Sequence, residues 1–267
     1  MKDVRYMTDL SKRLLAIASF VQPGSRIADI GTDHGYLPIY LMEQGIANHG
    51  IAMDIRKGPL DRAKEHIREA GLEEKIEARL SNGLEKLKPG EADTVVIAGM
   101  GGPLILDILK AGGHVVSDIK EFVLSPQSDW RGFRLEMEKL GLDICREAMV
   151  FEDGKYYLIV KAVHRKSTDE SGTDKADGGE ENFFGGCGEK ARNGENRSGS
   201  DDLSARFGAL LLEEKNPVLK DYLLWQEGIL TGILHKLAES RTFEVSRRRT
   251  EVEEELRYVL AALKLLQ

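Results

Sequence analysis

The stretch ADIGTDHGYLP, residues 28–38, decides the fold because it joins an apolar run to a helical pattern through a polar glycine turn. The apolar run, residues 26–30, follows the breaker Gln22-Pro23-Gly24 and predicts a buried parallel strand. Residues 36–44 have helical spacing and stop at Gly45. A turn in this place lies outside the carboxyl end of a strand, where open α/β sheets bind their ligands.

The charge of this turn argues against a dinucleotide site. In the pattern G-x-G-x-x-G, counted from Gly31, the later glycines would stand where the chain has Asp33 and Tyr36. A carboxylate there repels a pyrophosphate but attracts the sulfonium and ammonium groups of S-adenosylmethionine. We therefore predict S-adenosylmethionine as cofactor, bound by a turn that includes Asp29, Gly31 and Gly35. The simpler alternative is an ordinary connection in which Asp33 caps the helix.

Two further strand ends carry polar side chains. Asp54 closes the apolar run 50–55, at about the place where such folds put the acid that binds the ribose hydroxyls. Its alternative role is to cap the helix that begins near Lys57. Asn82 lies in the turn after the expected strand 75–80, where its amide could bond the adenine edge of the cofactor, or simply form the turn.

A second glycine turn, Gly99-Met100-Gly101-Gly102, follows the strong strand pattern of residues 93–98. So many glycines at one strand end suggest close approach by a ligand, or else a tight turn into the helix 104–110. We assign Gly99 to the cofactor, and Met100, Gly101 and Gly102 to a slot for the substrate.

After a fifth strand, residues 121–125, and a helix, residues 130–140, the alternation ends. The extended runs 142–151 and 155–163 are joined by Glu152-Asp153-Gly154, a hairpin signal. Alternating strands and helices closed by an antiparallel hairpin is the layout of class I S-adenosylmethionine-dependent methyltransferases. The predicted fold class is thus α/β, with a Rossmann-like sheet that nicotinamide-binding domains do not normally close in this way.

Together these motifs resemble the bacterial tRNA (adenine(22)-N(1))-methyltransferase family. The resemblance spans residues 5–164, returns near Arg206-Phe207-Gly208, and implies methyl transfer from S-adenosylmethionine to N1 of an adenine in tRNA. It also implies that a C-terminal coiled-coil arm helps to hold the tRNA. The motifs that carry it are Arg13-Leu14, residues 28–38, residues 98–102, Ser125-Pro126-Gln127 with Arg134, and Asp153-Gly154-Lys155-Tyr156-Tyr157.

The expected chemistry suggests roles for four residues. Adenine N1 carries an in-plane lone pair, so a carboxylate that stabilises the moving positive charge matters more than a base. Asp33 is the first choice for this catalytic role, and His34 could orient it or bond the adenine. Tyr36 could stack on the target or belong to the core. Arg13 could bind the cofactor carboxylate or an RNA phosphate, or be an ordinary surface arginine.

The rest of the chain predicts two further parts after the methyltransferase domain, residues 1–164. Residues 165–203 have the composition of a disordered low-complexity insertion, and residues 204–267 form a helical hairpin or coiled coil. In that arm the cluster Arg247, Arg248 and Arg249 could bind RNA phosphates, or form a solvated face balanced by nearby glutamates.

Composition sets outer bounds. The net charge of -7 and pI near 5.5 require any RNA site to be a local basic patch. Two cysteines and scattered histidines give neither a disulfide framework nor a metal site, and no segment predicts a membrane span or signal peptide, so we expect a cytoplasmic protein. Three alternatives stay open: a methyltransferase acting on another RNA or nitrogen, a nicotinamide-dependent oxidoreductase, and a non-catalytic RNA-binding module.

Overall fold

The computed structural model describes residues 10–165, 200–238 and 243–267. Most of the predicted insertion, including Cys187, lies outside these residues. No helix in the described ranges is long and apolar enough to cross a membrane.

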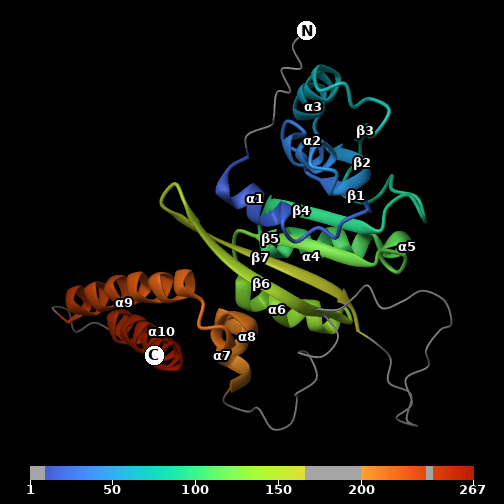
Figure 1. The fold of residues 1–267 in the computed structure, drawn as a ribbon. Coiled ribbons are helices and arrows are strands. Elements are labelled where there is room, and N and C mark those ends of the chain that lie inside the picture. Colours follow the sequence, from blue (N-terminus) through green and yellow to red (C-terminus); the bar gives the residue numbers. More distant parts are fainter. Residues whose placement is uncertain (1–9, 166–199, 239–242) are drawn as a thin grey trace, which may run out of the picture.

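A seven-stranded sheet forms the centre of the molecule, in the order β3-β2-β1-β4-β5-β7-β6 (Figure 1). The first five strands are parallel, β7 is antiparallel to β5, and β6 is antiparallel to β7. The predicted strands are therefore all present. Their bounds are β1 Ser25–Ile30, β2 Ala47–Asp54, β3 Ile76–Leu80, β4 Thr94–Met100, β5 Glu121–Pro126, β6 Leu142–Glu152 and β7 Lys155–His164.

Both faces of the sheet are covered, because successive side chains of a strand point to opposite sides. In β4, Val96 joins the apolar cluster with the first helices of the chain, whereas Val95 and Ile97 join the cluster with the middle helices. This double burial explains the continuous apolar runs of residues 95–98 in β4 and 122–124 in β5. The first helices are α1 Lys12–Ala18, α2 Tyr36–Glu43 and α3 Lys57–Glu69, and the middle ones are α4 Gly102–Ala111, α5 Gly113–Val116 and α6 Trp130–Lys139.

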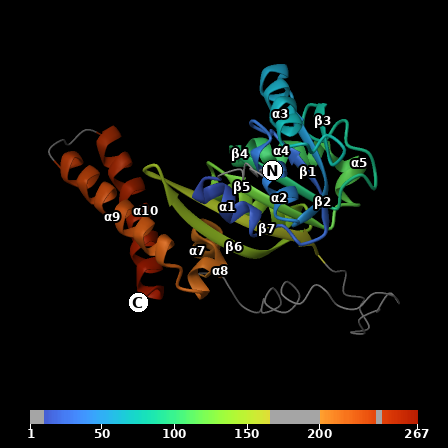
Figure 2. The same ribbon diagram turned by 45° about the horizontal axis from the view of Figure 1, so that its top comes forward.

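Four helices of the described ranges follow residue 199: α7 Ser200–Phe207, α8 Ala209–Glu213, α9 Pro217–Leu237 and α10 Phe243–Leu265. Helices α9 and α10 lie side by side and extend away from the sheet (Figure 2). Helix α7 begins at Ser200, within the last residues of the segment 165–203 that the composition marks as low-complexity. Sequence analysis missed α8 as a separate helix. Leu203, Phe207 and Leu211 pack against the core here, so this short segment buries more apolar surface than its polar neighbours suggest.

A buried ion pair joins the C-terminal helices to the sheet. Arg134 Nε on α6 lies 2.8 Å from Glu147 Oε1 on β6, and Arg134 Nη1 donates to the carbonyls of Ala205 and Arg206, each at 3.1 Å. Gly208 has a φ of +91° and leaves no room for a side chain, since a Cβ there would lie 2.5 Å from Glu147 Oε2. This junction fixes how the arm leaves the sheet.

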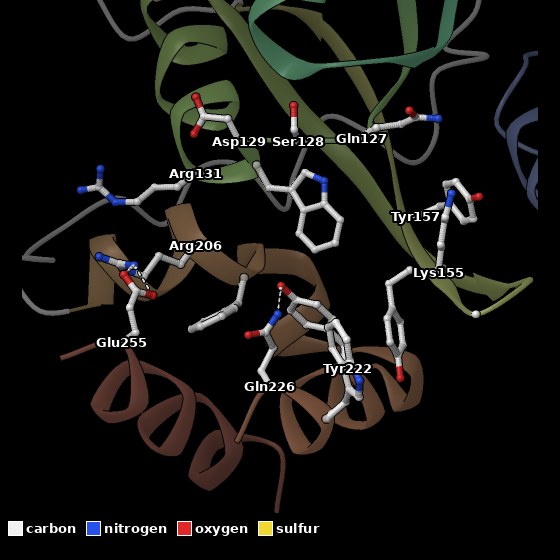
Figure 3. Close-up of a pocket in the computed structure, with 15 residues that line it drawn as sticks. Gln127, Ser128, Asp129, Arg131, Lys155, Tyr157, Arg206, Tyr222, Gln226 and Glu255 are labelled. Carbon is white, nitrogen blue, oxygen red and sulfur yellow. Dashed lines mark hydrogen bonds and ion pairs between the residues drawn. The ribbon is translucent and has the colours of Figure 1, made fainter. Parts of the chain in front are cut away.

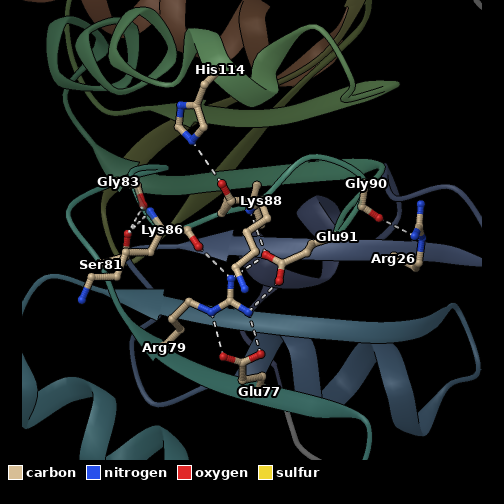
Figure 4. A network of polar contacts seen from close by, with 11 residues as sticks. Arg26, Glu77, Arg79, Ser81, Gly83, Lys86, Lys88, Gly90, Glu91 and His114 are labelled. Atoms are coloured by element: carbon tan, nitrogen blue, oxygen red, sulfur yellow. Dashed lines mark hydrogen bonds and ion pairs between the residues drawn. The ribbon is translucent and has the colours of Figure 1, made fainter.

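A second polar network fastens the loop after β3 (Figure 4). Arg79 pairs with Glu77 and with Glu91, both at 2.6 Å. Its guanidinium lowers the pKa of both carboxyl groups, which keeps them ionised. The loop that carries Asn82 is thereby anchored to the edge strand of the sheet.

Candidate active site

The turn from β1 to α2 is held by the neighbouring strand. The backbone N–H groups of Gly31 and Thr32 both donate to the carbonyl of Met53, at 2.8 and 2.9 Å. Gly31 and Gly35 have φ values of +76° and +71°, and His34 between them has +63°, an uncommon value for a residue with a side chain. Backbone geometry thus explains both glycines of the motif.

Asp33 is an exposed carboxylate and not a helix cap. Gly35 occupies the position before α2 and no side chain caps the helix, so the capping alternative is wrong. The Asp33 side chain is 74% exposed, and its Oδ1 lies 3.3 Å from Nε2 of His34. His34 therefore lies where it can orient Asp33.

Three rings stack beside Asp33. The rings of His34, Tyr36 and His66 are mutual neighbours, with centroids 5.1 to 5.6 Å apart and planes within 18° of parallel. Nδ1 of His66 lies 2.8 Å from the carbonyl oxygen of His34, which ties α3 to the turn. Tyr36 is 40% exposed, so the alternative that it belongs to the core is wrong. Sequence analysis missed His66 because only the packing of α3 brings it to the turn.

Two buried carboxylates stand on adjacent strands below the turn. Asp54 ends β2 and accepts a hydrogen bond from the backbone N–H of Arg56 at 2.6 Å. Arg56 precedes α3 without a side-chain cap, so Asp54 does not cap that helix. Burial raises the pKa of Asp29 to about 6, and the negative charge of Asp54 adds to the rise. Two carboxyl groups this close together disfavour the binding of an anionic ligand and favour a cationic one.

The second glycine turn lies directly against the first. A Cβ at Gly31 would stand 2.2 Å from Cε of Met100, so the Met100 side chain rests on the first turn. The glycines of this turn differ in the space around them. The carbonyl of Ser128 would lie 2.6 Å from a Cβ at Gly102, which shows that this glycine makes room for the chain itself. Only Gly99, with φ of +83°, faces open space, with Gln127 Nε2 as its nearest neighbour at 3.9 Å.

Three other groups of predicted site residues contact side chains of the chain itself. Asn82 Nδ2 donates to Glu85 Oε1 at 2.6 Å, and the guanidinium of Arg13 lies 5.3 Å from the ring centre of Tyr157. The exposed arginines of α10 pair with glutamates of the same helix, so the structure matches the alternative of a balanced, solvated face. These pairs are Arg247 with Glu251 at 3.3 Å, Arg248 with Glu251 at 3.1 Å and Arg249 with Glu253 at 2.7 Å.

A pocket of about 660 Å³ opens between the sheet and the C-terminal helices (Figure 3). Gln127 and Ser128, whose backbone bonds to the Gly99–Gly102 turn, form its wall toward the first turn. Sequence analysis missed this pocket because its walls come from four segments far apart in the chain. They are residues 127–131, residues 154–157, residues 206–207, and Tyr222, Trp225 and Gln226 of α9, with Glu255 beside them.

Among the residues that the structure describes, no group of His, Cys, Asp and Glu is placed to hold a metal ion. The chemical groups of the first turn are the carboxylates of Asp29 and Asp33, the imidazole of His34 and the exposed ring of Tyr36. This set suits a cationic ligand together with a planar base.

Comparison with known proteins gives concordant results. The sequence profile of the methyltransferase domain family matches residues 10–160. A tRNA (adenine(22)-N(1))-methyltransferase of Bacillus subtilis is 39% identical over 153 residues, which are 57% of this chain and 64% of that protein. This chain thus aligns with somewhat less than two thirds of that relative's length.

Solved structures agree over nearly the whole chain. The B. subtilis m1A22 tRNA methyltransferase TrmK superimposes with a TM-score of 0.75 at 28% identity, over 96% of this chain and 99% of that one. A Streptococcus pneumoniae protein, described as a putative tRNA (m1A22) methyltransferase in complex with S-adenosyl-L-methionine, gives 0.74 at 27% identity, over 96% and 100%. The predicted fold class and the resemblance stated from the sequence are confirmed.

Proposed function

Because this chain belongs to the methyltransferase domain family, we propose that it transfers a methyl group from S-adenosylmethionine to N1 of an adenine in tRNA. The name of the B. subtilis relative supports adenine 22 as the target. The observation that carries the proposal is the first turn, in which a carboxylate stands exposed above two buried ones.

The chain's residues fit the cofactor by charge. Asp29, whose pKa of about 6 leaves it mostly ionised at neutral pH, and the exposed Asp33 provide negative charge for a sulfonium and an ammonium group. We assign Asp54, at the end of β2, to hydrogen bonds from the ribose hydroxyls. Gly31, Gly35 and Gly99 let the backbone approach, while Asn82 is expected to reach the adenine edge once it releases Glu85.

In the proposed reaction, bound S-adenosylmethionine supplies an electrophilic methyl group on its sulfur. Adenine N1 attacks with its own lone pair, the bond between methyl carbon and sulfur breaks, and the positive charge passes to the adenine ring. Asp33 stabilises this charge, and His34 holds Asp33 in place through the contact at 3.3 Å.

The substrate base must leave its helix before it can react. N1 lies on the Watson–Crick edge, so a paired adenine has to be extruded first. We assign the exposed ring of Tyr36 to stacking on this base, and Met100 and Gly101 to the slot that receives it, while Gly102 shapes the turn by its close approach to the carbonyl of Ser128. For the RNA backbone we propose Arg13 and the cluster Arg247, Arg248 and Arg249 as phosphate contacts. A tRNA substrate implies a cytoplasmic protein.

Incubation with S-adenosylmethionine labelled on its methyl group and bulk bacterial tRNA tests the proposal. We expect label in the tRNA, and none when the tRNA is omitted or S-adenosylhomocysteine is in excess. An oxidoreductase would instead bind NAD, which an absorbance titration detects, and an RNA-binding module would bind tRNA without transfer. Either of those results with no transferred label contradicts the proposed function.

A further inference from the structure

The pocket beneath the β5–α6 turn is rich in exposed aromatic surface. We call it the aromatic pocket, because its lining includes Trp130, Tyr156, Tyr222 and Trp225. Trp225 is 50% exposed although it is among the largest apolar side chains of the molecule. A large ring left half open beside a cavity marks a surface suited to binding rather than to the core.

The rings support one another from three elements. The centroid of Tyr156, on β7, lies 5.1 Å from that of Tyr222 and 5.7 Å from that of Trp225, both on α9. Trp130, at the start of α6, lies 5.3 Å from Tyr222 and donates from Nε1 to the carbonyl of Pro126 at 2.9 Å. Gln226 Nε2 donates to the Tyr222 hydroxyl at 3.1 Å. The platform is therefore fixed before any ligand arrives.

The charges at the rim differ in their availability. Arg131 and Arg206 are both engaged by Asp202, at 2.7 and 2.8 Å, and Arg206 also pairs with Glu255. Lys155, at the hairpin tip, has no ion-pair partner among the described residues and is exposed. One available cation beside a stack of rings fits a nucleotide, since the rings hold the base and the lysine attracts its phosphate.

Gln127 lies between the aromatic pocket and the second glycine turn. This residue lines the pocket, donates its backbone N–H to the carbonyl of Met100 at 2.9 Å and faces the open space at Gly99. A polynucleotide whose target base enters the slot at Gly99–Gly102 therefore runs beside the aromatic pocket.

We propose that the aromatic pocket holds an unpaired nucleotide of the substrate RNA adjacent to the methylated adenine, with its base stacked on Trp225. This inference rests on the proposed function for the identity of the RNA. It adds a second binding point, contributed by the C-terminal helices, to the one in the methyltransferase domain.

Tryptophan fluorescence reports this pocket directly. The chain has two tryptophans, and both Trp130 and Trp225 line it. We expect an unmodified tRNA transcript with adenine at position 22 to quench their emission on binding. Absence of quenching by a transcript that binds at the same concentrations would overturn the proposal.

Affinity for the same transcript tests the role of Trp225. Loss of a stacked base weakens binding on the order of tenfold, so we expect Trp225→Ala to raise the Kd by about that factor. Trp225→Phe should restore most of the affinity, because it keeps an aromatic face. The matched control is Leu224→Ala, since Leu224 is 48% exposed on the same helix and does not line the pocket.

Transcripts with an abasic site on either side of adenine 22 identify the nucleotide. One of them should bind the wild-type protein about tenfold more weakly, yet bind Trp225→Ala no more weakly than the intact transcript. Equal losses in both proteins, or a Kd of Trp225→Ala equal to that of Leu224→Ala, would overturn the proposal. An unchanged cofactor Kd confirms that the variants are folded.

These readouts separate the two proposals. Binding and quenching need no turnover, so a wild-type protein that shows both but forms no methyladenosine contradicts the proposed function and keeps the aromatic pocket. A wild-type protein that methylates tRNA, with Trp225→Ala equally tight, overturns the pocket alone.

Discussion

Asp33 differs from the other carboxylates of the first turn in its exposure. Asp29 and Asp54 are buried, whereas the Asp33 side chain is 74% exposed, with Nε2 of His34 3.3 Å from its Oδ1. A carboxylate in this position can face the transferred charge without first losing a structural partner.

Replacing Asp33 therefore separates catalysis from binding. Asp33→Asn keeps the shape but removes the charge, so we expect turnover to fall about 10- to 100-fold with cofactor affinity changed far less. Steady-state kinetics and calorimetric titration of S-adenosylmethionine measure the two effects, with Asp61→Asn on α3 as control. Equal losses in turnover and affinity would show that Asp33 only binds the donor.

Asp29 predicts a pH dependence of stability. Its pKa is about 6 in the folded protein and 3.8 in a model peptide, so the folded state binds the proton more tightly. The contribution of Asp29 to the free energy of unfolding is therefore complete below about pH 4. It is lost as the pH rises through about 6, and the loss amounts to about 2–3 kcal/mol.

Urea unfolding at pH 4.5 and pH 7.5 measures this loss. The wild-type protein should lose more free energy of unfolding between these pH values than the Asp29→Asn variant, because that variant lacks the carboxyl group at residue 29. The same change in both proteins would contradict the raised pKa of Asp29.

The candidate site residues of the first turn could be predicted from the sequence, because they belong to one short segment of the chain. Asp33, His34 and the two glycines follow one another in the chain, so their proximity needed no knowledge of the fold. His66 and Trp225 lie on helices whose faces meet the site only after packing. Neither belongs to a motif that would have indicated such a position.

Among the elements, the start of α4 is fixed by a close approach of two backbones. Gly102 N donates to the carbonyl of Ser128 at 3.1 Å, and a Cβ at Gly102 would lie 2.6 Å from that oxygen. Gly102→Ala should destabilise the protein by about 1–3 kcal/mol, because a backbone atom has to move.

The matched control for this substitution is Gly58→Ala, also in the first turn of a helix. A Cβ at Gly58 meets nothing within 4 Å, so its free energy of unfolding should stay the same or rise slightly. Thermal and urea unfolding of the two variants measure the difference. Equal stability of both variants would contradict the close packing of the two turns.

Helix α10 carries the arginine cluster, whose side chains pair with Glu251 and Glu253. If tRNA phosphates replace these glutamates, changing Arg247, Arg248 and Arg249 to Ala should reduce the salt slope of tRNA binding by about 2. Filter binding across a salt series measures the slope. Changing the exposed Lys110, Lys120 and Lys139 to Ala removes the same charge from the α4–α6 side as a control, and an equal slope in both variants would reject the cluster as a phosphate site.

The whole molecule joins two parts that the sequence predicts separately. The alternating patterns predicted the sheet and its hairpin, and the apolar stripe of residues 218–237 predicted the long helix α9. Their junction could not be predicted, since Arg134 reaches the carbonyl of Ala205 across 71 residues. Neither periodicity nor composition shows which distant backbone a buried arginine will meet, so the aromatic pocket formed at this junction was also missed.

Methylated nucleosides test the central claim most directly. After reaction of bulk bacterial tRNA with the protein and S-adenosylmethionine, mass spectrometry of the digested RNA identifies and locates the product. The account predicts 1-methyladenosine at position 22, formed by the wild-type protein and strongly reduced with Asp33→Asn. Formation of no 1-methyladenosine, or of another methylated nucleoside in its place, would contradict it.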